Sequence, residues 1–257
     1  MHEPSSPSPS SSRPQISFVV PAYNEERLLP AALTAIVAEI RRTPCDAEII
    51  VVNNASTDAT ASVARSFEGV RVVDEPMKSL ARARQAGFLA AGGRLIANID
   101  ADTVLPAGWL RRVFDAFDAS PELVALSGPY VYNDISTLSR LVVRAFYLLG
   151  YGLCALNRLV FRVGSMLQGG NFVVTHDALE RIGGYRSDFA FYGEDTDVAC
   201  RLAAVGTVRF SFAQWAYSSG RRFAKEGLVR TGIRYAMNFV WTTAFQKPFT
   251  QTSQDIR

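Results

Sequence analysis

Two aspartates, Asp100 and Asp102, follow an apolar run of the chain and have the clearest potential for chemistry. The run, Leu95–Ile99, is typical of a short buried strand, so both carboxylates would lie just past its carboxyl end. In open parallel sheets, ligands bind at that edge. Two carboxylates there suit Mg²⁺ or Mn²⁺ carrying a phosphorylated substrate, because both ions prefer oxygen ligands. The same spacing occurs in solvated turns, so the interpretation depends on matching signals elsewhere.

Polar clusters follow two earlier apolar runs in the same way. Pro21-Ala22-Tyr23-Asn24-Glu25-Glu26 follows the first run, and Asn53-Asn54-Ala55-Ser56-Thr57-Asp58 follows the second. Asn24 could cap a helix that has acidic residues in its first turn, and Ser56 or Asp58 could cap the next helix. These local roles explain part of each cluster without any ligand.

Three further side chains could bind a ligand. Asn53 and Asn54 lie next to their strand, where a nucleobase or ribose could reach them. Arg84 lies in a helical pattern and could pair with a phosphate or with a carboxylate of the site. The alternative for Arg84 is a solvated helix face.

The elements that would position these residues alternate between strand and helix. Apolar runs predict buried strands, and apolar residues at helical spacing predict the helices between them. Short connections then imply a parallel sheet with right-handed crossovers, which is an α/β fold. The predicted strands are residues 16–20, 48–52, 70–73, 95–99, 124–127 and 172–175, and the predicted helices are residues 25–42, 58–66, 79–90, 106–119 and 178–182.

The amino-acid composition restricts the domain organisation and the classes of function that are possible. The chain has 257 residues, 48% of them hydrophobic, which is enough for one large globular domain. Its net charge of +3, without a basic run, gives no indication of nucleic-acid binding. Two histidines and three widely spaced cysteines disfavour zinc chemistry, and the isolated cysteines favour a reducing compartment. His176 is interpreted as structural. Residues 1–14 are rich in Ser and Pro, which predicts a disordered lead without a secretion signal.

Two apolar segments carry arginines, at residues 138–163 and 228–245. The first is too short between its charges to span a bilayer, which needs about 20 apolar residues. One interpretation is a core helical hairpin broken at Gly150 and Gly152. The other is an amphipathic segment that touches a membrane surface. The second segment poses the same choice.

Taken in chain order, these motifs resemble the family 2 inverting glycosyltransferases of the GT-A fold, over about residues 15–222. The family has an opening block similar to residues 21–26 and an acidic block where this chain has residues 53–58. Its Arg-Asn-x-Gly element resembles Arg84-Gln85-Ala86-Gly87, and its metal-binding Asp-x-Asp matches Asp100 and Asp102. The downstream matches are Gly169-Gly170-Asn171, Gly183-Gly184-Tyr185, Gly193-Glu194-Asp195-Thr196-Asp197, Arg201-Leu202 and Gly206.

The resemblance implies metal-dependent transfer of a single sugar from a UDP- or GDP-linked donor to an acceptor hydroxyl. It implies Mn²⁺ or Mg²⁺ at Asp102 and Asp100, and a base at Asp195 with Glu194 binding a sugar beside it. Asp197 is interpreted either as structural or as supporting the residues of the site. The implied nucleotide-sugar contacts are Pro21, Ala22, Tyr23, Glu25, Asn53, Asn54, Arg84, Asp100, Ala101 and Arg222, and the implied acceptor contacts are Gly169, Gly170 and Asn171.

The resemblance also implies an architecture. We expect a mostly parallel central sheet flanked by helices, with a Rossmann-like nucleotide-sugar half at residues 15–103 and an acceptor half at residues 104–222. An amphipathic helical tail would follow at residues 223–257. A lipid-linked or cell-envelope glycan acceptor would place the protein in the cytoplasm, on the inner face of the cytoplasmic membrane.

The chain departs from the family pattern in places that keep other functions open. Asn53 and Asn54 replace one or two aspartates; an amide carbonyl still accepts a hydrogen bond, so the choice between uracil and guanine stays open. No Gln-x-x-Arg-Trp follows Asp195, which argues against a processive enzyme, and Arg221 or Arg222 stands near the corresponding place. A non-catalytic nucleotide-sugar-binding protein is one alternative. A sugar nucleotidyltransferase is another, although the first loop lacks the glycines and the basic residue of that class.

Overall fold

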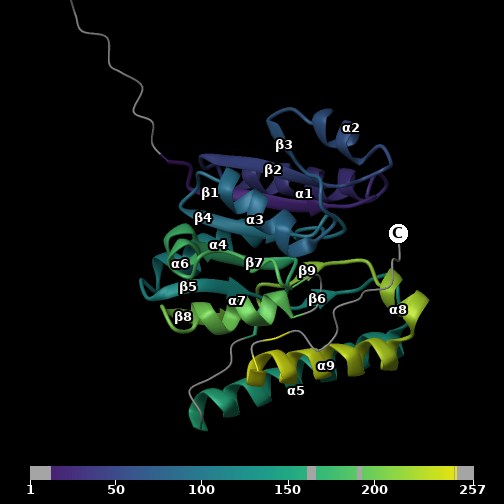
Figure 1. Cartoon of the computed structure of the whole chain (residues 1–257), viewed down its shortest axis with the longest axis vertical. Helices are drawn as coiled ribbons and strands as arrows, with labels where there is room; N and C mark the ends of the chain where they lie inside the picture. The colour runs from purple at the N-terminus through teal and green to yellow at the C-terminus, as the bar shows by residue number, and fades with distance from the viewer. Residues whose placement is uncertain (1–12, 161–165, 190–192, 246, 248–257) are drawn as a thin grey trace, which may run out of the picture.

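The computed structural model describes residues 13–160, 166–189, 193–245 and 247, and in them a central sheet lies between two layers of helices (Figure 1). The predicted lead lies almost wholly outside the described residues, as does the end of the predicted tail. The strands are β1 Ile16–Ala22, β2 Ala47–Asn54, β3 Val70–Glu75, β4 Leu95–Ile99, β5 Leu123–Ser127, β6 Tyr130–Val131, β7 Asn171–Thr175, β8 Thr207–Phe210 and β9 Ala216–Tyr217. The helices are α1 Leu29–Arg42, α2 Thr60–Arg65, α3 Leu80–Ala90, α4 Trp109–Asp118, α5 Thr137–Val160, α6 His176–Arg181, α7 Glu194–Leu202, α8 Arg221–Glu226 and α9 Leu228–Phe245.

The large sheet has the strand order β3-β2-β1-β4-β7-β5-β8. Neighbouring strands are parallel except where β7 pairs with β4 and with β5, so the sheet is mostly parallel, as predicted. Strands from both expected halves of the chain belong to this one sheet. A second, two-stranded sheet pairs β6 with β9.

Side chains alternate between the two faces of the sheet, because successive residues of a strand point in opposite directions. On β1, Phe18 and Val20 pack into the core beneath α1 and α4, whereas Val19 packs into the core beneath α3, α6 and α7. Both layers bury their apolar helix faces against the sheet. This burial on both faces explains why the short apolar runs of the sequence correctly predicted strands.

The first loop differs from the prediction. The helix predicted from residue 25 begins at Leu29, and Asn24 does not cap it. Asn24 has a left-handed backbone, with φ of 51°, and its Oδ1 accepts from the Thr57 backbone N–H over 2.8 Å. Asp58 also lies just outside its helix, where it accepts from the Thr60 N–H over 2.9 Å. The two loops are thus fastened to each other, which no local pattern could indicate.

Helix α5 contradicts the predicted core hairpin. It runs through Gly150 without a break, and Tyr147 is the one buried side chain in its residues 137–152. A glycine costs a helix only about 1 kcal/mol, which does not force a turn. The side chains of Arg158 and Arg162 lie outside the described part. Within the described residues, no helix is both long and apolar enough to cross a membrane.

Candidate active site

The predicted site residues follow strands whose ends meet at one edge of the sheet. β1, β2 and β4 are parallel, so their carboxyl ends coincide there. β7 runs the other way, and its first residue, Asn171, pairs with Ile99 at the end of β4. The glycines before β7 therefore reach the same edge, where the Gly170 carbonyl accepts from the Asp100 N–H over 3.2 Å.

Asp100 is held from two sides. Its Oδ1 accepts from Nη2 of Arg84 over 3.1 Å, and its Oδ2 accepts from the Tyr130 hydroxyl over 3.2 Å. Burial and the Asp100 charge raise the pKa of Tyr130, which keeps its hydroxyl a donor. A Cβ on Gly170 would lie 2.0 Å from the Asp100 Cγ. Close packing against this carboxylate accounts for the glycine; an acceptor contact at Gly169 or Gly170 stays a prediction.

Arg84 joins Asp100 to the second acidic motif. It is 1% exposed, and it forms an ion pair with the nearly buried Glu194 as well as with Asp100. A buried guanidinium needs such partners, since an unpaired one carries a large desolvation penalty. The structure therefore excludes a solvated helix face for Arg84. Direct contact between Arg84 and a nucleotide sugar stays a prediction.

Asp195 lies at the beginning of α7, half-buried and next to this network. Its Oδ1 accepts from the Thr196 backbone N–H over 2.8 Å. Burial raises the pKa of Asp195 above that of an ordinary aspartate, and the nearby Arg84 charge works against that shift. Asp197, two residues on, pairs with Arg201 over 2.7 Å and is structural, as interpreted from the sequence.

Asp102 pairs with an arginine from the C-terminal part of the chain. Nη2 of Arg221 lies 3.2 Å from Asp102 Oδ2, and the same guanidinium pairs with both carboxylate oxygens of Glu25. Arg222, the residue predicted to contact the nucleotide sugar, instead pairs with Glu226 over 3.1 Å. Arg221 and Arg222 differ in this way because successive residues of α8 point in different directions, and contact of either with a nucleotide sugar stays a prediction.

The two asparagines after β2 have different roles. Asn54 is 4% exposed, and its amide holds the loop before α3: it donates to the Met77 and Glu75 carbonyls and accepts from the Ser79 N–H. Its predicted nucleotide contact is therefore corrected to a structural role. The Asn53 amide donates to Asp74 over 2.8 Å, while its buried Oδ1 has no hydrogen-bond partner among the described residues.

Asn171, predicted to contact an acceptor, is fully buried. Its Oδ1 accepts from the Trp109 indole over 3.0 Å, and its Nδ2 donates to the carbonyls of Gly128 and Gln214. All its hydrogen-bonding capacity joins parts of the fold. The structure gives Asn171 a structural role in place of the predicted one.

The other residues predicted to contact the nucleotide sugar lie at or just after the ends of β1 and β4. Pro21 and Ala22 end β1 and are buried, and Ala101 is buried between the two aspartates. Tyr23 lies under the ammonium group of Lys78, 3.8 Å from the ring centroid. Their contacts with a nucleotide sugar stay predictions. Sequence reasoning missed Tyr130, whose position just after β5 was its only signal.

The carboxylate oxygens at this edge are suitable ligands for a divalent cation. The carboxylates of Glu25, Asp100, Asp102, Glu194 and Asp195 stand against the guanidinium groups of Arg84 and Arg221, which leaves a formal charge of −3. Mg²⁺ and Mn²⁺ bind such oxygen-rich sites. Asp100 and Asp102 are the residues that would hold the ion.

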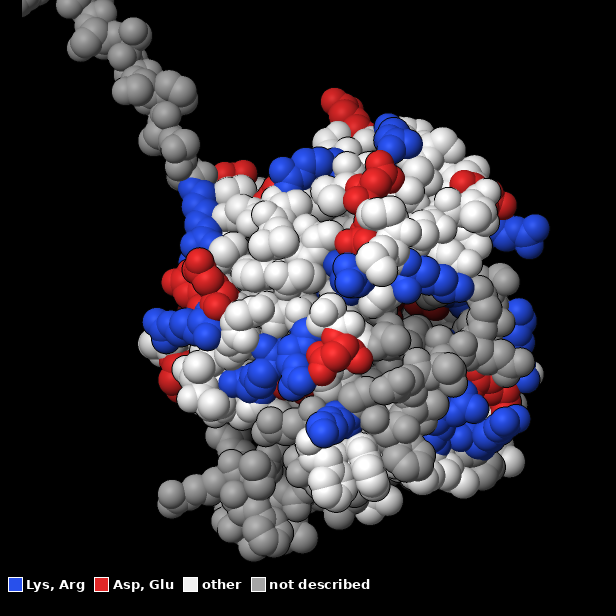
Figure 2. Space-filling model, in the orientation of Figure 1, with Lys and Arg blue, Asp and Glu red and all other residues white. Residues whose placement is uncertain are grey.

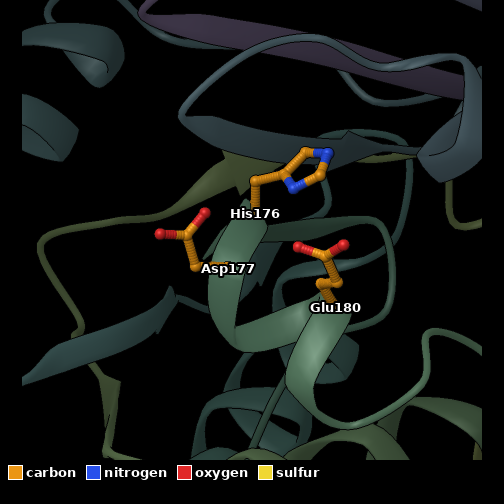
Figure 3. A group of neighbouring side chains, drawn as sticks. All are labelled: His176, Asp177 and Glu180. Atoms are coloured by element: carbon orange, nitrogen blue, oxygen red, sulfur yellow. The ribbon is translucent and has the colours of Figure 1, made fainter.

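A second group of potential metal ligands lies at the opposite edge. His176, Asp177 and Glu180 bring their ligand atoms within 4.8 Å of one another at the start of α6 (Figure 3). They follow the carboxyl end of the reversed strand β7, whose last residue pairs with Leu95 at the beginning of β4. The Asp177 carboxylate already pairs with Arg13 over 3.3 Å. This group is separate from the candidate active site.

The fold and the acidic edge define an α/β protein with a candidate ligand site, and comparison with known families identifies the class more specifically. The model described as glycosyl transferase family 2 matches residues 17–183, well over half of the chain. The chain belongs to glycosyl transferase family 2.

Curated relatives match over part of the chain. An uncharacterized glycosyltransferase of Mycobacterium tuberculosis is 41% identical over 109 residues, which are 42% of this chain and 46% of that protein. A dolichyl-phosphate beta-glucosyltransferase of Trichomonas vaginalis is 39% identical over 102 residues, 35% of this chain and 31% of that protein. The matched stretch thus spans less than half of each relative.

Solved structures share the fold over most of the chain. A mannosyltransferase from Pyrobaculum calidifontis, in complex with GDP-Man and Mn²⁺, has a TM-score of 0.63 at 22% identity, covering 88% of this chain and 65% of that one. Glucosyl-3-phosphoglycerate synthase from Mycobacterium tuberculosis, in complex with Mn²⁺ and UDP-glucose, has a TM-score of 0.63 at 19% identity, covering 92% and 81%. At these identities the likeness establishes the GT-A glycosyltransferase fold.

Proposed function

We propose that this protein is an inverting glycosyltransferase that moves a single sugar from a nucleoside-diphosphate sugar to an acceptor hydroxyl. One observation carries the proposal: Arg84 joins Asp100, at the end of β4, to the distant acidic motif Glu194-Asp195 of α7, at the edge where the α/β fold binds ligands. Two solved structures of this fold contain a GDP- or UDP-linked sugar with Mn²⁺, which supports the donor class and the ion.

Each residue of the site has a separate role in the proposed reaction. Mn²⁺ or Mg²⁺ at Asp102 and Asp100 would neutralise charge on the departing nucleoside diphosphate. Asp195 takes the proton of the acceptor hydroxyl while that oxygen attacks the anomeric carbon from the face opposite the diphosphate, which inverts the configuration. Arg84 fixes Asp100 relative to the α7 motif, and the Asn53 carbonyl accepts from a ring N–H of the base.

Donor turnover is the test of this function. Purified protein is incubated with UDP-, GDP- and dTDP-sugars and Mn²⁺ or Mg²⁺, with and without chelator, and release of the nucleoside diphosphate is measured. We expect slow hydrolysis that chelator abolishes and that falls at least about 100-fold in Asp102→Asn and in Asp195→Asn. Asp115→Asn, an exposed carboxylate on α4, is the matched control.

The other outcomes separate the alternatives. Binding of a sugar nucleotide without turnover, even with candidate acceptors present, would favour a non-catalytic binding protein. Formation of a sugar nucleotide from a nucleoside triphosphate and a sugar phosphate would identify a nucleotidyltransferase. Failure to bind any sugar nucleotide would contradict the proposal.

We further propose that the acceptor is a lipid-linked or cell-envelope glycan, reached by peripheral contact with the inner face of the cytoplasmic membrane through α5 and α9. The α5 side chains Leu138, Leu148 and Leu149 are 73%, 62% and 65% exposed, and Arg140 and Arg144 are exposed beside them. On α9, Ile233, Met237, Trp241 and Phe245 are exposed as well. Both helices appear at the lower end of the molecule in Figure 1, and the described side chains that Figure 2 shows at this end are mostly uncharged, with isolated basic ones. Exposed apolar residues with arginines suit an anionic lipid surface.

Sedimentation with vesicles tests this contact. We expect the protein to sediment with vesicles that contain anionic phosphatidylglycerol at low salt, and a Leu138→Ser/Leu148→Ser/Leu149→Ser variant to stay in the supernatant. Leu89→Ser, which changes a leucine 74% exposed on α3, is the matched control and should still sediment. Wild-type protein that stays in the supernatant would contradict the contact.

A further inference from the structure

Arg221 brings the C-terminal part of the chain onto the predicted cation site. Its Nη1 and Nη2 form a fork on the two carboxylate oxygens of Glu25, and Nη2 also lies 3.2 Å from Asp102 Oδ2. Glu25 comes from the loop after β1, and Asp102 comes from the end of β4. One guanidinium therefore stands at a carboxylate that is expected to bind the metal.

Glu25 anchors this guanidinium. The Glu25 side chain is 2% exposed, and its backbone N–H donates to the Thr60 hydroxyl over 2.8 Å. A buried carboxylate must keep its partner, because an unpaired buried charge is strongly destabilising. The segment before Arg221 is held too: the Gly220 N–H donates to both carboxylate oxygens of Asp134 over 2.8 Å.

A further donor of Arg221, its Nε, favours the binding of an anion. Its Nε is buried and has no hydrogen-bond partner among the described residues. A buried charged donor left unsatisfied is costly, so an oxygen of a bound ligand is its natural partner. Arg221 favours a bound anion but disfavours a metal ion at Asp102, since a positive charge beside that carboxylate weakens its attraction for a cation.

We propose that Arg221 is a built-in occupant of the cation site that couples the binding of divalent cation and nucleoside diphosphate. Without ligands, Arg221 neutralises Asp102 and opposes the cation. When a diphosphate binds, the guanidinium keeps its fork on Glu25 and pairs with the diphosphate, which frees Asp102 for the cation. By linkage, each ligand then raises the affinity for the other by the same factor. This inference rests on the proposed donor and cation.

Mn²⁺ binding, followed by the electron paramagnetic resonance signal of free Mn²⁺, tests the coupling. Wild type is compared with Arg221→Gln, each with and without UDP or GDP. We expect Arg221→Gln to bind Mn²⁺ alone about tenfold more tightly, because a repelling charge is gone, and to gain little from nucleotide. The wild type should gain about tenfold or more from the nucleotide that it binds. Arg111→Gln removes the same charge on exposed α4 and should behave as wild type.

Two further variants separate the possible failures. Glu25→Gln/Arg221→Gln removes the buried charge pair as a unit, so it should fold even if the single variant does not, and it should also bind Mn²⁺ alone more tightly. If Asp102→Asn binds Mn²⁺ with nucleotide as well as wild type does, the proposed metal site itself is wrong. If Asp102 matters but neither variant at Arg221 binds Mn²⁺ alone more tightly than wild type, the coupling is wrong and the metal site stands.

Discussion

At the scale of single residues, burial and charge act in opposite directions on Asp195. Desolvation makes its carboxylate more basic, while the Arg84 guanidinium favours the charged form. A base in a transfer reaction benefits from a raised pKa, provided that it is still ionised at the working pH. The Arg84 charge and the backbone hydrogen bond to Oδ1 both favour the ionised form of Asp195 that a base needs.

The pH dependence of turnover should report this residue. Asp195 must be deprotonated to accept a proton, so kcat/KM should fall as the pH drops through a pKa above the ordinary aspartate value. In Asp195→Asn the acid limb should disappear, with residual activity about 10²–10⁴-fold lower. Both proteins are compared from about pH 4 to about pH 8.

The stability of that variant provides the control. Asn keeps an oxygen to accept from the Thr196 N–H and removes a desolvated charge, so the melting temperature should not fall. An acid limb that persists in Asp195→Asn would assign the titration to another group.

At the scale of elements, the loop between β3 and α3 depends on one side chain of β2. Asn54 bonds to the backbone of Glu75, Met77 and Ser79, so it fixes the loop that places Lys78 over Tyr23. The change from Asp to Asn in this motif thus serves the loop: the amide supplies two donors and one acceptor, which a carboxylate cannot.

Removing this amide should loosen the loop. Asn54→Ala leaves three backbone groups without their partner, and at about 1 kcal/mol for each hydrogen bond the free energy of unfolding should drop by about 2–3 kcal/mol. Urea denaturation measures it. Asn53→Ala, which loses one side-chain partner, should cost less than half as much. Equal losses in the two variants would show that Asn54 does not hold the loop.

At the scale of the whole molecule, Asn171 connects regions that the sequence keeps far apart. It bonds to the indole of Trp109 on α4, to the carbonyl after β5 and to the carbonyl of Gln214 beyond β8. A fully buried amide with every group satisfied ties these regions to the middle of the sheet.

Asn171→Ala should destabilise the entire fold. The loss of three buried hydrogen bonds costs about 3 kcal/mol, which for a chain of this size lowers the melting temperature by roughly 6–12 °C. Thermal unfolding followed by circular dichroism measures the change. Asn133→Ala, at an exposed position, is the matched control and should melt like the wild type. If the melting temperature of Asn171→Ala shifted only slightly, the structural role would be contradicted and the predicted acceptor contact would be considered again.

The sequence by itself determined the α/β class, the strands of the first half and the edge where the site lies. The Leu95–Ile99 strand was predicted to the residue, because its apolar run and the polar residues after it are local signals. The same signals placed Asp100 and Asp102 at the end of β4, and the ordered motifs identified the family.

Only the tertiary structure decided which of the candidate side chains lie in the site and which have a structural role. Asn54 and Asn171 belong to the fold, Arg221 rather than Arg222 faces Asp102, and α5 continues through its glycines. None of these outcomes has a local signal, because each partner lies far along the chain: Arg221 and Asp102 are 119 residues apart. Periodicity and propensity report on neighbours in sequence, whereas ion pairs and buried amides are satisfied by neighbours in space.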